Sequence, residues 1–441
     1  MKKIIGLIMV LCLTLTMFAA CGASSSASSA AAESSASKAE TGEPVEISFM
    51  HIWPELAEIM DKNIADFEAE NPDIKVNTTV IPWDQLTKTL QTSFAAGDAP
   101  DISVAWLDRM GGFKAIDACL DITSYMTDNN NEWKDSFVPS ALSLGTVGDA
   151  ICGVPFRTTC TILCYNKTML EENGWELPKT LEEFEALNEK VVAAGLTPLL
   201  APGNPEGFQV ASLIRTFAEN ELYKTGKLQS QEYLSGYLSD VSEEYALAGE
   251  RARNWLNNGW IGKDSLALKR EEAQAQFFSN KALFFFANNN ELASLRGLAE
   301  EAGIEIGFTG FPTPEGLPNL LFNLGVDGFM VYSKTEHPEE SIRFLKYMTS
   351  AEVQSMWAKE TLSVMGNQTI SYDDADQKAM ADIFAKGETY RIRFTYAQGA
   401  LLTDEAIAAA DFIADSSMTP EQYGKNIAAL KQACIDENGT K

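Results

Sequence analysis

Trp106, Asp108 and Arg109 stand together in the stretch PDISVAWLDRMGG (100–112), directly after alternating apolar residues that predict a buried β-strand. An aromatic ring can cover the apolar face of a sugar, while a carboxylate accepts and a guanidinium donates hydrogen bonds to neighbouring hydroxyl groups. The three side chains therefore indicate a carbohydrate-binding wall. The alternative is an ordinary ion pair beside a tryptophan that fills the core.

Two earlier stretches also place a tryptophan beside an acid after a predicted strand, namely Trp53 with Glu55 and Trp83 with Asp84. Pro54 would make the first pair rigid, whereas Trp83 could instead pack against the helix that follows it. The carboxyl ends of parallel strands share one edge of a sheet, and ligands bind there in open α/β folds. We therefore expect both pairs to lie on the same wall as Trp106.

The elements that must position these residues become legible at residue 46. EISFMHIW (46–53) and the alternating apolar residues of 74–80 predict strands, and apolar residues at helical spacing over 56–67 and 86–94 predict helices. With the strand of 100–112, this order predicts a parallel sheet with right-handed crossovers.

A second unit is expected to begin near residue 155. Thr180 and Glu183 form a capping-box pattern at the start of a helix. ALFFFANNN, IEIGFTGFP and GFMVYS predict three further strands, and the last 100 residues are mainly amphipathic helix. The chain of 441 residues is also long enough for two or three units.

The formal net charge of -28 argues against a nucleic-acid partner, because such partners are bound largely by neutralising their phosphates with Lys and Arg. The sequence has no G-x-S-x-G, H-E-x-x-H or phosphate-binding glycine loop, so we expect no enzyme. The enzymatic alternative is a glycoside hydrolase with Glu55 and Asp108 as its paired carboxylates.

The first twenty residues are typical of an export signal, with Lys2 and Lys3 before an apolar run that ends in Ala19-Ala20. FAACG resembles the lipobox of bacterial lipoproteins, which implies that Cys21 carries the lipid. Residues 22–44 are rich in Ser and Ala and lack apolar bulk, so 21–44 are expected to be the lipidated cysteine and a flexible tether. The mature protein is thus expected on the outer face of the cytoplasmic membrane.

The cysteines of the mature chain have no regular spacing, which argues against a disulfide framework. We expect them to be small buried apolar residues, although Cys160 and Cys164 could share a strand face as a metal pair. No cofactor or metal is expected. The five residues beyond the lipidated one are Cys119, Cys152, Cys160, Cys164 and Cys434.

Several motifs together resemble the family 1 extracellular solute-binding proteins, the carbohydrate receptors of ABC importers, of which maltose-binding protein is a member. ADFEAENPDIKV, FAAGDAPDI, GVPF, LCYNKTMLEENGWELPKTLEEFEAL and GFMVYSKTEHPEESIRFLKYM follow the family pattern in order. The resemblance implies an α/β, two-lobed periplasmic-binding-protein fold of type II, with a mostly parallel sheet flanked by helices in each lobe and a ligand cleft between the lobes. It also implies a monomer that delivers its sugar to the transmembrane subunits of an ABC permease.

The resemblance also places the lobe boundaries. Residues 45–154 with 310–350 are expected to form the N-terminal lobe, and 155–309 with 351–441 the C-terminal lobe. The chain is expected to cross between them near 153–157, 306–311 and 350.

By the same resemblance, Trp106, Asp108 and Arg109 match residues that bind sugar hydroxyls in the family. Other candidates lie near the first crossing, at strand ends or in the last helical region, where the alternatives are a strand end, a turn or a packed helix face. These further candidate ligand-binding residues are Arg157, Asn204, Phe208, Asn288, Asn289, Asp327 and Tyr396.

Other solutes remain alternatives to a sugar. A polyamine would need extra acids in the cleft, an iron chelate would need clustered tyrosines, and an oxyanion would need helix amino ends without aromatic platforms. Tryptophans beside mixed charges favour the sugar.

Replacing the predicted lipidation site tests the anchor. Cys21→Ser should release the mature protein from membranes, because the tether alone has no apolar segment to hold it there. Fractionation of cells into membrane and soluble material measures the change. A Cys21→Ser variant that stays with the membranes would contradict the anchor.

Overall fold

The computed structural model describes residues 43–202, 208–234, 238–262, 264, 267–318, 322–385 and 398–437. Residues 43–441 form one compact unit. Four predicted features lie outside the described residues: the export signal, the tether with Cys21, Asn204 and Tyr396. The described residues include no helix that is both long enough and apolar enough to cross a membrane.

The predicted order of strands and helices in the first 65 described residues is confirmed. Strands β1 (Val45–His51), β2 (Ile74–Val80) and β3 (Ile102–Trp106) pair in parallel, with β1 in the middle. Helices α1 (Ala57–Glu70) and α2 (Leu86–Ala96) connect them. Their carboxyl ends therefore share one edge of the sheet.

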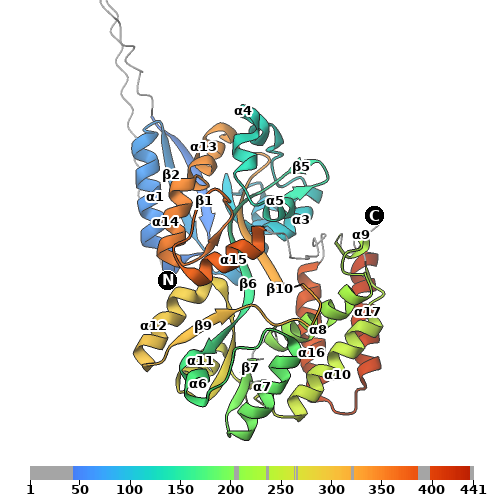
Figure 1. Ribbon diagram of the computed structural model, residues 1–441. Helices are drawn as coiled ribbons and strands as arrows, with labels where there is room; N and C mark the ends of the chain where they lie inside the picture. Colours follow the sequence, from blue (N-terminus) through green and yellow to red (C-terminus); the bar gives the residue numbers. More distant parts are fainter. Residues whose placement is uncertain are drawn as a thin grey trace, which may run out of the picture. The chain divides into compact units, whose positions relative to one another are not determined.

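The sheet continues beyond β3 through two long strands, β10 (Phe322–Val331) and β6 (Val154–Asn166), which pair antiparallel with each other. The order along the sheet is β2-β1-β3-β10-β6-β8-β7, and β9 and β11 also pair with β6. In Figure 1, β6 and β10 run from the upper group of elements into the lower one. The remaining strands are β4 (Thr146–Val147), β5 (Ala150–Ile151), β7 (Thr197–Leu200), β8 (Ala282–Asn288), β9 (Ile306–Thr309) and β11 (Val364–Met365).

The mostly parallel pairing expected in each lobe holds for β1, β2 and β3. Around β6 the pairing is antiparallel, and only β7 with β8 is parallel there. The four strands that pair with β6, namely β8, β9, β10 and β11, all run opposite to it.

Helix α7 (Leu181–Ala193) shows how local sequence sets an element boundary. The side chain of Thr180 accepts a hydrogen bond from the Glu183 N–H (3.2 Å), and the Glu183 carboxylate accepts one from the Lys179 N–H (2.7 Å). The further helices are α3 (Met110–Ala115), α4 (Thr123–Asp135), α5 (Pro139–Leu144), α6 (Lys167–Asn173), α8 (Phe208–Lys224), α9 (Gln231–Leu234), α10 (Ser242–Asn257), α11 (Arg270–Phe278), α12 (Leu292–Ala302), α13 (Pro338–Met348), α14 (Ala351–Thr361), α15 (Ala375–Ala385), α16 (Gln398–Ala414) and α17 (Pro420–Glu437), and the 3₁₀ turns are η1 (Pro54–Leu56), η2 (Trp83–Gln85), η3 (Leu107–Arg109) and η5 (Asn289–Glu291).

The buried apolar residues form three clusters. Cluster one joins β1, β2, β3 and β10 with the start of β6 and the helices packed on them. Clusters two and three lie around the rest of β6, where Leu163 belongs to cluster two and Ile162 and Cys164 belong to cluster three. This split follows from the alternation of side chains along a strand.

Helix α14 lies beyond residue 350, the expected boundary between the lobes, and packs into cluster one. Val353, Trp357 and Ala358 of this helix belong to cluster one, together with Met365 beyond it. The buried apolar face of α14 therefore groups it with the elements expected in the N-terminal lobe. Its sequence position after residue 350 did not reveal this, because an amphipathic helix does not specify which core it joins.

All five cysteines beyond the predicted lipidation site are buried and free, as expected for small apolar core residues. Cys160 and Cys164 do share the side of β6 that contributes to cluster three. Burial raises the pKa of both thiols, so their thiolate forms are disfavoured. In the described part of the chain, no group of three or more His, Cys, Asp or Glu residues is arranged to hold a metal ion.

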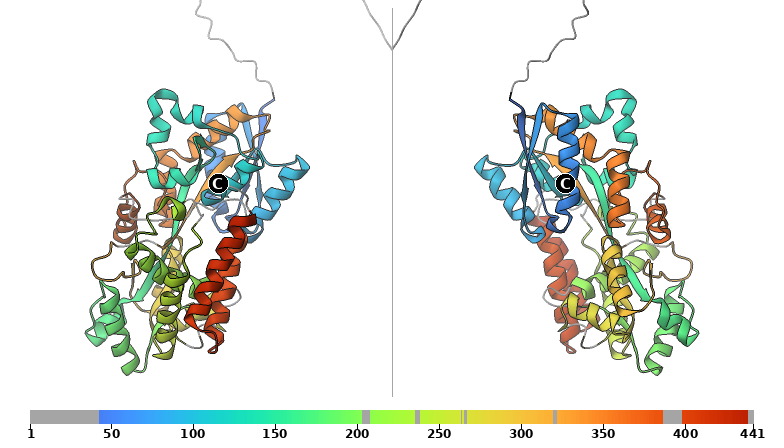
Figure 2. Two further views of the ribbon diagram at one scale, coloured as in Figure 1. Left: turned by 90° about the vertical axis from the view of Figure 1, so that its right-hand side faces the viewer. Right: turned by 90° about the vertical axis from the view of Figure 1, so that its left-hand side faces the viewer.

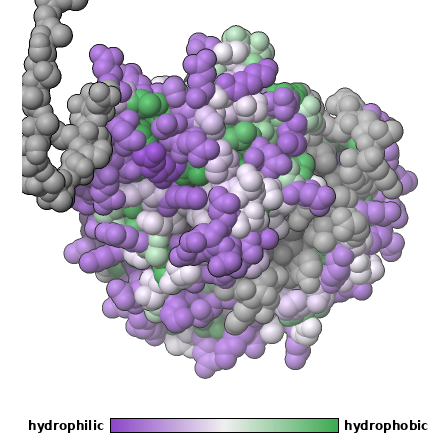
Figure 3. Space-filling view, turned by 90° about the horizontal axis from the view of Figure 1, so that it is seen from above, coloured by the Kyte–Doolittle hydropathy of each residue, from purple (hydrophilic) through white to green (hydrophobic). Residues whose placement is uncertain are grey.

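The surface seen from above in Figure 3 is mostly hydrophilic, with small separate apolar spots. The large apolar side chains that are exposed among the described residues are scattered over different elements. They are Val80, Trp83, Ile116, Val192, Leu247, Leu298 and Ile407.

A buried ion-pair network ties helices α8, α16 and α17 together beside α10; Figure 2 shows α16 and α17 side by side. Glu405 on α16 bonds Arg215 on α8 and Lys431 on α17, both at 2.7 Å. Burial alone would raise the pKa of Glu405, but the charges of Lys431 and Arg215 outweigh it and lower the pKa to about 2. Because this pKa lies below the ordinary value, the network adds stability above about pH 4.5 that is lost as the pH falls toward 2.

Glu405→Gln should lower the free energy of unfolding at pH 7 by roughly 3 kcal/mol, because the buried Lys431 and the half-buried Arg215 would lose the charge of this carboxylate. The difference from the unchanged protein should shrink between pH 4.5 and 2, where Glu405 itself becomes protonated. Urea unfolding over this pH range measures both effects. Glu243→Gln, at an exposed site on α10, is the control and should change stability by no more than about 0.5 kcal/mol; equal losses in the two variants would contradict the network.

Candidate ligand-binding site

The 3₁₀ turn η3 keeps Asp108 and Arg109 close to Trp106 at the end of β3. The guanidinium carbon of Arg109 lies 4.2 Å from the centroid of the Trp106 ring, and Arg109 Nη1 donates to Thr87 Oγ1 at 2.9 Å. Trp106 is partly exposed, whereas Asp108 is buried. The turn therefore presents an aromatic ring with a cation across it, and the adjacent carboxylate lies beneath the surface.

Sheet register brings two other predicted residues next to Trp106. Asp327 on β10 lies opposite Trp106 on β3 on one side and opposite Arg157 on β6 on the other. Arg157 Nε donates to Asp327 Oδ2 at 2.7 Å, and both side chains are buried. Residues 106, 327 and 157 thus form one row across three adjacent strands.

Trp53 lies inside the protein rather than on its surface. Its side chain is only 1% exposed, its ring is stacked on Phe156 at 5.4 Å, and the Arg157 guanidinium lies 4.8 Å from the ring centroid. Its backbone N–H donates to His51 Nδ1 at 3.3 Å, and burial lowers the pKa of His51 more than the nearby charge of Asp61 raises it. The burial favours Trp53 as a core residue beneath Arg157 over the ligand-facing role expected from its strand end.

Trp83 has the opposite placement. It follows β2 in the turn η2 and is 62% exposed, so it does not pack its ring into the helix that follows. Glu55, after β1, is also exposed. Both residues stand at the sheet edge to which β3 brings Trp106, as the parallel pairing requires.

The two candidate asparagines after β8 have structural hydrogen bonds. Asn289 is fully buried; its Oδ1 accepts from the Cys160 N–H at 2.7 Å and its Nδ2 donates to the Thr158 carbonyl at 3.0 Å. Asn288 is half-buried, is the last residue of β8 and caps the turn η5, and its backbone N–H donates to Glu291 Oε2 at 2.7 Å. The oxygen and the nitrogen of the Asn289 side-chain amide therefore both bond the backbone of β6.

The structure connects five of the predicted residues through contacts: Trp53, Trp106, Arg109, Arg157 and Asp327. The side chains of Asp84 and Phe208 lie outside what the structure describes, as do Asn204 and Tyr396. Sequence reasoning missed Thr87, which bonds Arg109, and Trp357, whose ring lies 5.7 Å from that of Trp53. Thr87 could have been found from its place in the first turn of α2, but Trp357 comes from a distant helix and has no local signal.

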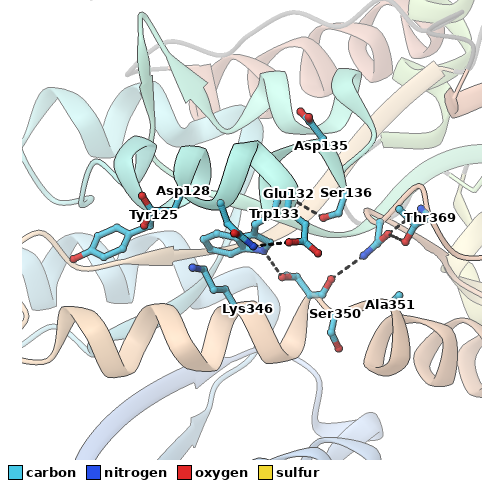
Figure 4. Close-up of a pocket in the computed structure, with 13 residues that line it drawn as sticks. Tyr125, Asp128, Glu132, Trp133, Asp135, Ser136, Lys346, Ser350, Ala351 and Thr369 are labelled. Carbon is cyan, nitrogen blue, oxygen red and sulfur yellow. Dashed lines mark hydrogen bonds between the residues drawn. The ribbon is translucent and has the colours of Figure 1, made fainter.

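A cavity of about 580 Å³ contains none of the predicted site residues. It lies where α4 faces the junction of α13 and α14, and its lining is shown in Figure 4. Polar groups at its base bond one another: Trp133 Nε1 donates to Thr349 Oγ1 at 2.9 Å, and Asn367 Nδ2 donates to the Thr349 carbonyl at 3.0 Å. The cavity is therefore separate from the sheet edge that carries the predicted site residues.

The model of the family described as bacterial extracellular solute-binding protein matches residues 53–355. The chain belongs to this family. Its members are receptors rather than enzymes, and this chain is a receptor of the same kind. The match begins at Trp53, directly after β1, and ends within α14, so it includes the residues that follow β1, β2 and β3 at the sheet edge described above.

Individual relatives agree with this assignment. The chain is 25% identical over 374 residues to the multiple sugar-binding protein of Streptococcus mutans, covering 80% of each chain. It is 25% identical over 323 residues to the maltodextrin-binding protein of Bacillus subtilis, covering 71% of each. The structure of the GacH receptor of Streptomyces glaucescens superposes with a TM-score of 0.73 at 16% identity, covering 90% of this chain and all of that one, which confirms the periplasmic-binding-protein fold.

Two alanine substitutions separate the buried from the exposed tryptophan. Trp53→Ala should lower the free energy of unfolding without ligand by roughly 3–5 kcal/mol, because it empties a space in cluster one. Trp83→Ala should change it by no more than about 0.5 kcal/mol, because the ring is largely in water already. Denaturant unfolding measures both; a Trp83→Ala loss as large as that of Trp53→Ala would contradict the placement.

Proposed function

We propose that this receptor captures a mono- or oligosaccharide and delivers it to the permease of an ABC importer. The observation that carries the proposal is the combination at the sheet edge of the exposed Trp83, the partly exposed Trp106 and the charged group of Arg109. The aromatic rings suit the apolar faces of sugar rings, and the charged group suits hydroxyls. The relatives named for sugars support the same class of ligand.

The charge of the site also bears on the alternatives. Asp327 is already paired with Arg157, and with Asp108 and the exposed Glu55 the described site residues carry one acid more than bases. A polyamine would be favoured by excess acids, and an oxyanion by excess bases. One extra acid beside exposed aromatic rings is not the cluster of acids that a polyamine would need, so a neutral ligand with many hydroxyl groups fits the site better than either.

Capture is proposed to occur by closure of two lobes over the sugar. The N-terminal lobe would comprise residues 45–154 with 310–350, joined by α14, and the C-terminal lobe 155–309 with the remaining C-terminal residues. A ligand that touches both lobes favours the closed state by its difference in affinity for the two states. The permease could then distinguish a loaded receptor from an empty one.

The proposed location of the receptor in the cell rests on the sequence of residues 1–44. The export signal, Cys21 and the tether would hold a monomer by its lipid on the outer face of the cytoplasmic membrane. The family description as extracellular agrees with export.

A thermal-shift screen with maltotriose, xylotriose, raffinose and chitotriose tests the ligand class. A sugar present at about 1,000 times its dissociation constant should add roughly 4 kcal/mol to the stability of the protein. Trp106→Ala should make the free energy of binding that sugar less favourable by a few kcal/mol, because truncation of an aromatic hot spot commonly has an effect of this size. Calorimetry measures the affinity, and chromatography of the same mixtures should recover the sugar unchanged.

The control is Trp260→Ala, because Trp260 lies in a different part of the fold, packed on cluster two. It should leave the affinity for sugar unchanged. Stabilisation by spermidine or by phosphate, with no response to any of the sugars, would replace the carbohydrate by one of the alternative solutes.

A further inference from the structure

Two buried thiols from separate segments of the chain meet beside the end of β10. Cys119 lies between α3 and α4, and Cys152 lies between β5 and β6. Their side chains are 1% and 0% exposed, and both belong to cluster one. The pair is near the amino end of β3, because Cys119 opposes Tyr332 and the preceding residue, Val331, pairs with Ile102 at the start of β3. It is therefore separate from the candidate sugar site at the carboxyl end of β3.

The sheet brings the two segments into line along one side of β10. Strand β6 begins with Val154, which pairs with Phe329 of β10. Farther along the same side, Cys119 forms an antiparallel bridge with Tyr332, directly after β10. The other side of β10 is occupied by β3. Cys152, two residues before Val154, thus lies where the chain that enters β6 meets the segment of Cys119.

Backbone hydrogen bonds hold these two segments side by side. The Ile122 N–H donates to the Ile151 carbonyl at 2.9 Å, and the Ile151 N–H donates to Thr123 Oγ1 at 2.9 Å. The thiols themselves are in contact. A hydrogen bond between them raises the pKa of Cys119, whose proton it holds, and lowers the pKa of Cys152.

The other described cysteines differ from this pair in their placement. Cys160 and Cys164 share one side of β6, but they are four residues apart, so their Cα atoms are separated by about 13 Å. A disulfide bond requires a Cα separation below about 7 Å. Cys434 lies on α17, which packs against α10 in a different part of the fold.

We propose that Cys119 and Cys152 are joined in a disulfide bond that staples the segment after α3 to the chain that enters β6. The oxidant is another disulfide, either of a small thiol compound or of a thiol oxidoreductase outside the cell. The family of this chain is described as extracellular, and disulfide bonds form and persist outside the cytoplasm, where thiols are not kept reduced. The bond forms whether or not the receptor binds a sugar.

The bond forms by two successive thiol–disulfide exchanges. The thiolate of one cysteine attacks a sulfur of the oxidant, and the first oxidant thiolate leaves. The thiolate of the other cysteine then attacks the cysteine sulfur of this mixed disulfide, and the second oxidant thiolate leaves. The two protons lost by the cysteines end on the two oxidant thiolates, so two thiols are oxidised and one disulfide is reduced. Because both cysteines are buried in the folded chain, the exchange takes place while the chain folds or the segment opens.

The bond would close a loop over residues 119–152, which contains α4, α5, β4 and β5. A cross-link over a loop of this length lowers the entropy of the unfolded chain and so stabilises the folded one. For a chain of this size, the oxidised protein should melt roughly 3–5 °C above the reduced protein.

Alkylation of the mature protein tests whether the bond forms. The protein is refolded in a mixture of reduced and oxidised glutathione, quenched with acid, unfolded and alkylated without a reductant. Mass spectrometry of its peptides should find Cys119 linked to Cys152, and the alkyl label on Cys160, Cys164 and Cys434. Label on both Cys119 and Cys152, or links from Cys119 to the other cysteines in equal yield, would overturn the proposal.

Melting temperatures in oxidising and reducing buffers test the staple. Cys119→Ser should melt at the same temperature in both buffers, because it cannot form the bond. Cys160→Ser is the matched control: it changes a buried thiol on β6 outside the pair and should keep the full difference of the unchanged protein.

An oxidised protein that melts no higher than the reduced one would overturn the stapling role. A difference that persists in Cys119→Ser would assign the effect to other cysteines and would equally overturn it. Cys152→Ala provides the same test at the other thiol if Cys119→Ser does not fold. None of these measurements uses a ligand, so their outcome is independent of the sugar screen.

Discussion

The buried ion pair between Arg157 and Asp327 is the interaction on which the arrangement of the candidate site depends. Removing two charges from water is expensive, so a pair of this kind persists only with good geometry and further contacts. Here the bond is 2.7 Å long, and the guanidinium also lies over the ring of Trp53. The pair fastens β10 to β6 in the row that places Trp106 at the edge of β3.

Trp53 and Trp83 show how the same local pattern can lead to different roles. Each tryptophan follows a strand of the same parallel group and stands at the start of a 3₁₀ turn with an acid, Trp53 directly before η1 and Trp83 as the first residue of η2. Trp53 follows the central strand β1 and is covered by Phe156 and Trp357, whereas Trp83 follows the edge strand β2 and is exposed. A buried ring stabilises the floor of the site, and an exposed ring is available to a ligand.

Polar side chains take over from apolar packing where the clusters meet. Along β6 the apolar side chains change clusters between Phe156 and Cys160, and the backbone there bonds the amides of Gln354 and Asn289. Hydrogen bonds are directional and apolar contacts are not, so amides can define where a strand is held without filling the space around it.

The sequence alone determined the βαβαβ order, the strands β8, β9 and β10, and the helical C-terminal part, because periodicity and capping residues act within one element. It also determined that Trp106, Asp108 and Arg109 stand at a strand end, and it identified the family through ordered motifs. Only the tertiary structure decided that Trp53 is buried, that Asn289 bonds β6 and that α14 joins cluster one. Those outcomes depend on Phe156, Trp357 and Thr158, which lie far along the chain and meet these residues only when the sheet is assembled, so no local pattern could contain them.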